Sequence, residues 1–344
     1  MRFESEGILG VLDSTKELSD SFGRIAKKLR ISITDRCNMR CIYCMPFNNT
    51  KWLSQKSILT YEQITYLAEI FASLGIEKIK ITGGEPLVRV DIISLIKSLS
   101  SIKGINSISM TTNGILLKDR VAGLKEAGLE SINISLDTFN RTRFKSISGI
   151  DGLDIVLESI KSAVSQNLRV KINTVIIRDW NDDEISEFVE FSKKTGCPVK
   201  FIEFMPLDGT KIWSENLVVS KDEMIDKINN DFGKLSPLDN DKADPARLYR
   251  FDNGNATIGF IPSITKPFCQ DCDRVRITAE GKLHTCLFEK KNYDLKALLD
   301  KGKSDKEIQE YIRNCILEKP EGIIKIIKNH SLEPGINNMY SIGG

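Results

Sequence analysis

Six of the eight cysteines stand in two groups whose spacing suits metal or redox chemistry. The groups are Cys37, Cys41 and Cys44, spaced C-x3-C-x2-C, and Cys269, Cys272 and Cys286, spaced C-x2-C-x13-C. In a reducing compartment, thiols this close bind metal more often than they form disulfides. Three thiolates on one short loop can ligate three irons of a [4Fe–4S] cube and leave the fourth iron open. Cys197 and Cys315 stand alone, and we expect both to be buried as small hydrophobic residues.

A zinc site is the alternative for each group, because each group is one ligand short of four. Zinc sites usually join a C-x2-C pair to a second pair or to histidines, and His284 and His330 are the histidines of this chain. His284 lies two residues from Cys286 and could complete a zinc site there. A zinc-binding structural protein, with both groups as folding staples, therefore stays open as an alternative.

Cations accompany the cysteines at positions where a strand is expected. Arg274 and Arg276 follow Cys272 with i, i+2 spacing, so in an extended segment both side chains point to one side. Lys171 lies inside a β-branched run, where burying a charge is costly unless an anion meets it. Arg30 and Lys80 lie in similar runs. The sequence has neither a Walker A motif nor GxGxxG, so these side chains predict a site for several phosphates held without a glycine loop.

Short β-branched runs alternate with helical patterns through the first two thirds of the chain. The runs cover 29–34, 78–82, 107–112, 131–136, 169–177 and 199–205, and the helical patterns cover 60–74, 91–99, 119–127, 153–166 and 183–194. This repeated βα order predicts a parallel sheet. Polar residues on one face of several strands indicate a barrel around a polar cavity. We therefore expect an α/β fold, a partial (βα)6 TIM-type barrel.

The pattern changes after Pro206. An irregular stretch to about Asp244 precedes short strands at 248–251, 256–260 and 275–278, the second cysteine group and helical segments. This order predicts a smaller C-terminal α+β domain that carries the second group. We place an N-terminal extension at 1–20, the barrel at 21–235 and the C-terminal domain at 236–344.

The unusual residues follow the expected strands at their carboxyl ends. The cysteine loop follows the first run, TGGEP at 82–86 the second, TNG at 112–114 the third, and the pairs at 136–137 and 205–206 follow the fourth and sixth. In parallel α/β folds, these loops converge at one edge, where ligands bind. One pocket should therefore receive them all.

C-x3-C-x2-C after the first strand of a βα barrel, with GGEP after the second, resembles the radical S-adenosylmethionine superfamily. The resemblance implies a [4Fe–4S] cluster at the first cysteine group and S-adenosylmethionine as cofactor. We expect Gly84 to bind the methionine amino group, because a glycine can adopt positive φ and approach a ligand closely. The other implied cofactor-binding residues are Tyr43 beside the adenine, Ser135 and Asn173 at strand ends, and the backbone of Met205.

A longer ordered set of motifs resembles the GTP 3′,8-cyclase family of molybdenum cofactor biosynthesis. The set runs from LRISITDRCNMRCIYCMP through TGGEPLVR, TTNG, INISLD, FIEFMP and the Cys-x2-Cys-x-Arg-x-Arg segment to the final Gly-Gly. The resemblance implies a second [4Fe–4S] cluster whose free iron binds the substrate, GTP. The implied substrate-binding residues are Arg30, Lys80, Thr111, Lys171, Arg274 and Arg276, and the implied catalytic residues are Arg274, Arg276, Gly343 and Gly344. At Lys80 the family usually has arginine, so the bidentate fork is lost there.

The family implies that an adenosyl radical removes hydrogen from ribose C3′ and that the carbon radical attacks guanine C8. The product is (8S)-3′,8-cyclo-7,8-dihydroguanosine 5′-triphosphate, which passes to the cyclic pyranopterin monophosphate synthase. The resemblance also implies an external electron donor and a monomer or homodimer. Another two-cluster radical enzyme, of the peptide-maturing type, is an alternative, although those generally carry more C-terminal cysteines than Cys315 supplies.

Length and charge set outer bounds on the function. The 344 residues suffice for about two domains. The net charge of +2, from 49 basic and 47 acidic residues, gives no global field for nucleic acid or an anionic membrane. The N-terminus is acidic where a signal peptide is basic, and the chain has no apolar run of ~18 residues. We expect a cytoplasmic protein.

Overall fold

The structure is a computed structural model that describes residues 17–45, 52–207, 211–252, 254, 256–323, 325 and 338–343. Of the expected N-terminal extension, only residues 17–20 are among them. Gly344 and His330 lie outside the described residues.

Six βα units form the first two thirds of the fold, as the sequence predicts. Their strands are β1 Lys28–Ser32, β2 Lys78–Thr82, β3 Ser107–Thr112, β4 Ser131–Ser135, β5 Arg169–Ile176 and β6 Val199–Glu203. The helices between these strands are α1 Tyr61–Ser73, α2 Ile92–Ser100, α3 Val121–Glu126, α4 Arg141–Ser148, α5 Leu153–Ser165 and α6 Ile185–Thr195, with both α4 and α5 between β4 and β5. The sequence analysis missed α4, a polar helix that the side chain of Asn140 caps by accepting a bond from Arg143 N at 3.0 Å.

The rest of the described chain adds strands and helices around this core. The elements are α7 Lys221–Phe232, β7 Leu235–Pro237, β8 Arg247–Phe251, β9 Thr257–Ile261, β10 Arg274–Ile277, β11 Lys282–His284, β12 Tyr293–Asp294, α8 Leu295–Asp300, α9 Asp305–Leu317 and α11 Met339–Ile342. The prediction of an irregular stretch up to Asp244 was wrong. Ser220 opens α7 with a capping box to Glu223, a signal that the sequence carries.

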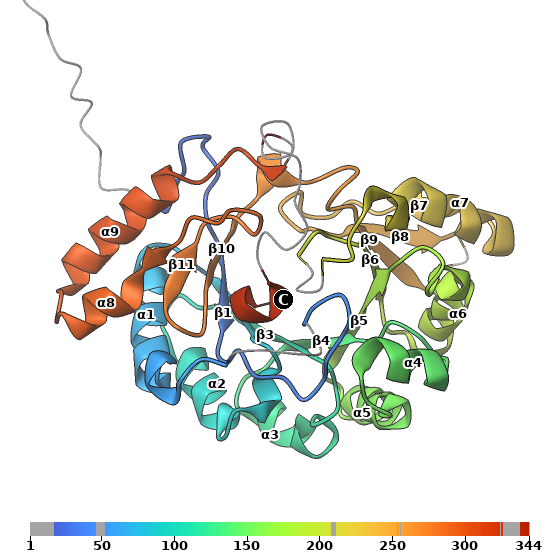
Figure 1. The fold of residues 1–344 in the computed structure, drawn as a ribbon, viewed down its shortest axis with the longest axis horizontal. Helices are drawn as coiled ribbons and strands as arrows, with labels where there is room; N and C mark the ends of the chain where they lie inside the picture. The colour runs from blue at the N-terminus through green and yellow to red at the C-terminus, as the bar shows by residue number, and fades with distance from the viewer. Residues whose placement is uncertain are drawn as a thin grey trace, which may run out of the picture.

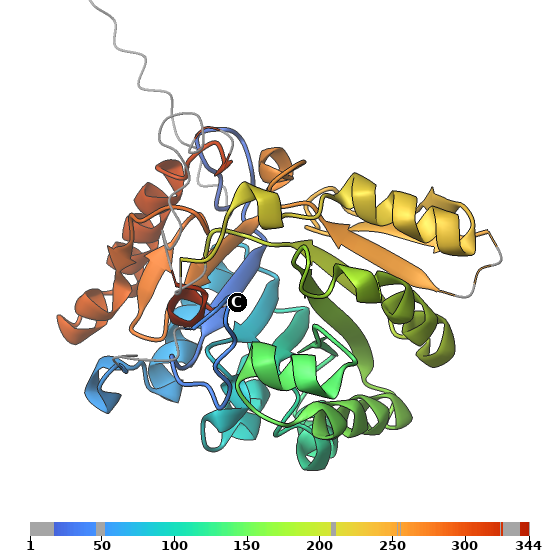
Figure 2. The same ribbon diagram turned by 45° about the vertical axis from the view of Figure 1, so that its right-hand side comes forward.

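The twelve strands among the described residues belong to one sheet, in the order β12-β11-β10-β1-β2-β3-β4-β5-β6-β9-β8-β7. The strands from β10 through β6 to β9 run parallel, and the outer pairs are antiparallel. The C-terminal strands thus extend the βα sheet at both of its ends, and the sheet curves around a centre that faces α11 (Figures 1 and 2). The partial barrel is compatible with this arrangement, and the proposed domain boundaries stay a prediction.

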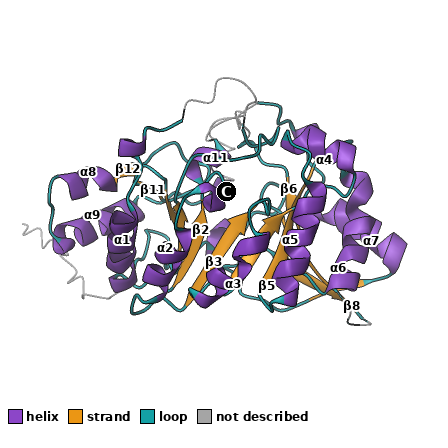
Figure 3. Cartoon of the chain, turned by 90° about the horizontal axis from the view of Figure 1, so that it is seen from below, coloured by secondary structure: helices purple, strands orange, loops and turns teal. Residues whose placement is uncertain are grey.

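The two faces of the sheet have different environments. In β5, Val170, Ile172 and Ile176 are buried on the outer face, where the helices pack, and Lys171 and Asn173 alternate with them and face inward. Figure 3 shows α2, α3 and α5 on the outside of the sheet and α11 on the other side. Cys197 and Cys315 are both buried, as expected. No helix in the described part of the chain is both long and apolar enough to span a bilayer.

Candidate active site

One cavity of about 780 Å³ occupies the inner side of the sheet. Both cysteine groups line it, and so does every residue that the sequence analysis assigned to cofactor or substrate: Arg30, Tyr43, Lys80, Gly84, Thr111, Ser135, Lys171, Asn173, Met205, Arg274 and Arg276. The structure therefore brings the loops at the carboxyl ends of the strands to one place. The roles of these residues stay predictions.

The first cysteine group lies on a tight loop directly after β1. The amide of Cys44 donates to the carbonyl of Cys41 at 2.9 Å, which turns the loop back on itself. The sulfur of Cys37 accepts bonds from the amide of Met39 at 3.4 Å and from Nδ2 of Asn113 at 3.7 Å. Burial raises the pKa of Cys37 to about 11 and that of Cys44 to about 12. Thiols in this setting ionise readily only when a positive metal centre compensates for the lost hydration.

The donor set fits an iron–sulfur cluster by its chemistry. Three soft sulfur ligands sit on one loop, and amide groups point at one of the sulfurs, as they do around clusters whose potential is tuned by N–H···S bonds. No three His, Cys, Asp or Glu side chains among the described residues converge on a point that could hold a single metal ion.

The GGEP loop packs against the backbone of the cysteine loop. A Cβ on Gly84 would lie 2.4 Å from the carbonyl oxygen of Arg36 and 2.6 Å from that of Asp35. The expectation of positive φ at Gly84 was wrong, since the residue has no such conformation. The glycine is needed because two backbones approach each other there. Its amide donates to the carbonyl of Thr34 at 2.7 Å, which joins the two loops.

Glu85 ties the same loop to the end of β3. Its carboxylate accepts bonds from Thr112 Oγ1 at 2.7 Å, from Asn113 N at 2.7 Å and from Leu87 N at 3.0 Å. Burial raises the pKa of Glu85 to about 7. This staple fixes three loops relative to one another, because Asn113 also bonds the sulfur of Cys37.

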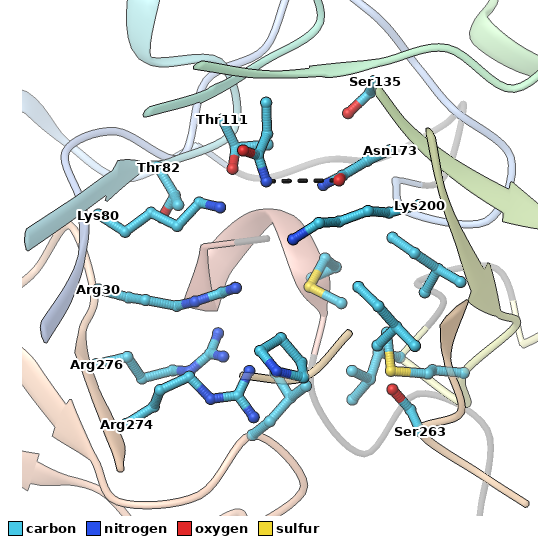
Figure 4. A pocket seen from close by; sticks show the side chains of 18 of the residues that line it. Arg30, Lys80, Thr82, Thr111, Ser135, Asn173, Lys200, Ser263, Arg274 and Arg276 are labelled. Atoms are coloured by element: carbon cyan, nitrogen blue, oxygen red, sulfur yellow. Dashed lines mark hydrogen bonds between the residues drawn. The ribbon is translucent and has the colours of Figure 1, made fainter. Parts of the chain in front are cut away.

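A hydrogen bond joins the side chain of Tyr43 to Asp137, which lies in the loop after β4. Its hydroxyl donates to Asp137 Oδ2 at 2.5 Å, and Asp137 also accepts a bond from Val175 N at 2.9 Å. Ser135 and Asn173 are register partners on β4 and β5, so their side chains lie side by side, as Figure 4 shows. The backbone carbonyl of Met205 accepts a bond from Leu207 N at 2.8 Å.

Cations form a row across adjacent strands. Arg276 of β10 pairs in register with Arg30 of β1, and Arg30 with Lys80 of β2. Figure 4 shows the charged ends of these side chains and of Arg274 directed into one space. Burial and then the charge of Arg276 hold the pKa of Arg30 well below its usual range. Burial and then Arg30 do the same to the pKa of Lys80.

Lys200 belongs to this set, and the sequence analysis missed it. It pairs in register with Asn173, is 7% exposed and points into the same space from β6 (Figure 4). Burial lowers its pKa to about 8. The signal was present, because Lys200 lies inside the β-branched run at 199–205 just as Lys171 lies inside its own run.

None of these cations forms an ion pair with a carboxylate in the described part of the protein. Ion pairs within 4.0 Å to described residues are absent for Arg30, Lys80, Lys171, Lys200, Arg274 and Arg276. Unpaired charges are costly to bury. This set of cations therefore suits a ligand with several negative charges.

The second cysteine group is fixed by two buried cations. Lys319 Nζ donates to the carbonyls of Cys272 at 2.9 Å and Arg274 at 3.0 Å, and Arg24 Nη1 donates to the carbonyl of Cys269 at 2.8 Å. Burial alone would raise the pKa of the Cys272 thiol, but Arg274 and Lys319 outweigh it and lower this pKa to about 7. The thiol is thus poised to bind metal as a thiolate.

The C-terminal tail reaches this site. Arg276 Nη1 donates to the carbonyls of Gly343 at 2.7 Å and Ile342 at 3.2 Å. Gly343 has φ +81°, and a Cβ there would lie 2.4 Å from Thr82 Oγ1 and 3.0 Å from Ser32 Cβ. Glycine is therefore required for the tail to enter this gap, and Figure 1 shows α11 over the centre of the sheet.

Comparison with known proteins agrees with this geometry. The family model described as "Radical SAM superfamily" matches residues 31–192, and that described as "Molybdenum Cofactor Synthesis C" matches residues 197–324. A GTP 3′,8-cyclase of Thermodesulfovibrio yellowstonii is 44% identical over 329 residues, which span 95% of this chain and 100% of the relative. A GTP 3′,8-cyclase of Rhodopirellula baltica is 40% identical over 95% of this chain and 92% of the relative. The chain belongs to the GTP 3′,8-cyclase family.

Membership of this family, within the radical S-adenosylmethionine superfamily, implies one [4Fe–4S] cluster and S-adenosylmethionine. Identity over nearly the full length decides against the zinc-binding structural protein that the cysteine spacing left open. The crystal structure of Streptococcus suis SuiB superposes with a TM-score of 0.60 over 91% of this chain and 77% of SuiB, at 17% identity. That likeness concerns the fold alone.

Proposed function

We propose that this protein is a GTP 3′,8-cyclase that converts GTP to (8S)-3′,8-cyclo-7,8-dihydroguanosine 5′-triphosphate in molybdenum cofactor biosynthesis. The observation that carries the proposal is the row of partly or fully buried cations without ion-pair partners among the described residues, in the cavity that both cysteine groups line. A triphosphate supplies the several adjacent negative charges that such a row requires.

In this proposal, Cys37, Cys41 and Cys44 hold the [4Fe–4S] cluster. When bound there, the cluster supplies the electron that cleaves S-adenosylmethionine to the 5′-deoxyadenosyl radical, which abstracts hydrogen from the substrate. Gly84, Tyr43, Ser135, Asn173 and Met205 bind S-adenosylmethionine. The Glu85 staple keeps the loops that carry these groups in fixed positions, which limits side reactions of a reactive intermediate.

The substrate lies against the cation row. The triphosphate is held by Arg30, Lys80, Lys171 and Lys200. Thr111 also binds the substrate. Lys80 acts as a point charge there, because an ammonium group has no bidentate fork. Its place in register between Arg30 and Ser109 supports this contact.

Cys269, Cys272 and Cys286 hold a second [4Fe–4S] cluster that faces the substrate. The thiol of Cys272, with its pKa lowered to about 7, supports this assignment. Arg274 lies beside that cluster and orients the substrate. Arg276, Gly343 and Gly344 act together as catalytic residues. The bond from Arg276 to the carbonyl of Gly343 supports a joint role for these residues.

The proposal includes partners that supply electrons and take the product. An external donor reduces the first cluster, and the product passes to the cyclic pyranopterin monophosphate synthase. The protein acts as a monomer or homodimer.

The substrate assignment is tested by binding in the reconstituted protein without oxygen. The double variant Arg30→Met, Lys80→Met should bind GTP at least tenfold more weakly than wild-type protein. Its affinity for S-adenosylmethionine should stay within twofold of the wild-type value, because neither side chain is assigned to the cofactor. Equal loss of both ligands would contradict the separation of the two sites. Undiminished GTP binding would contradict the role of the cation row.

A further inference from the structure

The cavity has an acidic residue that neither cofactor nor substrate accounts for. The carboxylates that line the cavity are Glu85, Glu130, Asp137, Glu203, Asp241 and Asp244. The first five accept hydrogen bonds or form ion pairs with described residues, for example Glu203 with the amides of Ile264 and Thr265 at 2.9 Å each. The Asp244 carboxylate has no such partner among the residues that the structure describes.

The position of Asp244 is nevertheless fixed by its backbone. Its amide donates to the carbonyl of Asp241 at 2.9 Å, and its carbonyl accepts a bond from Arg247 Nη1 at 2.7 Å. Pro245 follows and restricts the backbone of Asp244 further. The segment is thus built to hold one side chain in the cavity, with no described residue to satisfy it.

This segment lies near the amino-terminal end of β1, away from the first cysteine loop and close to the start of β10, which follows the second cysteine group. Asp241 pairs with Lys28 at 3.5 Å, and Lys28 is the first residue of β1, whereas the first cysteine loop follows the last residue of β1. Near the same segment, a Cβ on Gly259 would touch both Lys200 Cγ at 3.1 Å and Ala246 Cβ at 3.5 Å. The stem of Lys200 therefore runs beside the segment that presents Asp244.

The charge of Asp244 acts on the phosphate-binding cations. It raises the pKa of Arg30, Lys80 and Lys200 against the larger, opposite effect of burial. For Lys200, it is the strongest of the charges that act on that side chain. No ion pair within 4.0 Å joins Asp244 to these cations among the described residues, yet its charge reaches them, so a phosphate bound by these cations also experiences the charge of Asp244.

We propose that Asp244 is a specificity-determining residue whose fixed negative charge weakens the binding of the terminal phosphate of the substrate. The inference rests on the proposed function, because it concerns the triphosphate of that substrate. The product keeps this triphosphate, so the same cations that capture GTP also retain the product. A repulsive charge at the terminal phosphate limits that retention and shortens the residence time of the product.

The test compares Asp244→Asn with wild-type protein, both carrying reconstituted clusters, by equilibrium binding of GTP, GDP and inorganic triphosphate. We expect GTP and inorganic triphosphate to bind about tenfold more tightly to the variant, which corresponds to about 1.4 kcal/mol. GDP should gain less, because it lacks the phosphate nearest Asp244. The cyclised product should dissociate more slowly by a similar factor.

Two further variants separate charge from structure. Asp244→Glu keeps the charge and should bind like wild type, and Asp239→Asn removes one charge from an exposed residue outside the cavity and should also bind like wild type. If Asp244→Asn fails to incorporate iron, Asp244→Ser is measured in its place. Unchanged or weaker GTP binding in a folded variant overturns the inference. If wild-type protein binds no GTP, the proposed function itself fails.

Discussion

Replacing Gly84 with alanine should separate the cysteine loop from the GGEP loop. The new Cβ would lie 2.4 Å from Arg36 O, about 1 Å closer than ordinary van der Waals contact, and 2.6 Å from Asp35 O. Both obstacles are backbone atoms, so no side-chain rotation relieves the overlap and one loop must move by about 1 Å. Overpacking of this kind costs ~1–3 kcal/mol of unfolding free energy. A shift of ~1 Å in a reacting group lowers the rate by ~100-fold.

The assay measures urea unfolding, iron content after anaerobic reconstitution and the rate of S-adenosylmethionine cleavage. Gly123→Ala is a matched control, because its Cβ would meet only the end of the Ile93 side chain, at 2.8 Å, and alanine favours helix α3. We expect the control to keep its iron and its cleavage rate. A Gly84→Ala protein that cleaves S-adenosylmethionine within twofold of the wild-type rate would refute the close-approach reasoning.

The remaining predictions concern the two cysteine groups, the tail and one buried acid. Cys41→Ala should abolish S-adenosylmethionine cleavage, as chromatography would measure. Cys272→Ala should retain cleavage but lose cyclisation and ~4 irons per chain, as chromatography and iron analysis would measure. Full cyclisation in Cys272→Ala would contradict the role of the second cluster. Deleting Gly343 and Gly344 should leave the iron content unchanged and stop cyclisation. Unchanged turnover would contradict a catalytic role for these two residues. The raised pKa of Glu85, about 7 against an ordinary 4.5, favours the protonated form in the fold, so the unfolding free energy should fall by ~3 kcal/mol as pH rises from about 4.5 to 7. Urea unfolding across this range should give a flatter profile for Glu85→Gln, and parallel profiles would contradict the assignment.

The βα order and the positions of the site loops could be predicted because they depend on local pattern. β2 and β3 have the bounds expected from their β-branched runs, and the cation at Lys80 stands out because such a run rarely holds a charge. Lys200 carries the same signal and could have been found by the same reasoning. The helix α4 was missed because its sequence is polar and its buried residues are few.

Other features depend on contacts between distant segments, which one sequence does not reveal. The C-terminal strands join both ends of the βα sheet, and no local pattern specifies which edge each strand pairs with. Glycine is needed at position 84 because a neighbouring backbone lies close to it, and not because of its own φ. The unpaired state of Asp244 appears only when the partners of every other acid in the cavity are known.

The most direct test of the account is turnover without oxygen after reconstitution with iron and sulfide. The protein is incubated with S-adenosylmethionine, dithionite and GTP, and chromatography follows 5′-deoxyadenosine, GTP and the cyclised triphosphate, with a parallel reaction without GTP. We predict that GTP disappears and that 5′-deoxyadenosine and cyclised product appear in equal amounts. Formation of 5′-deoxyadenosine while GTP survives would contradict the substrate assignment, and absence of both reactions in protein with intact clusters would contradict the radical chemistry itself.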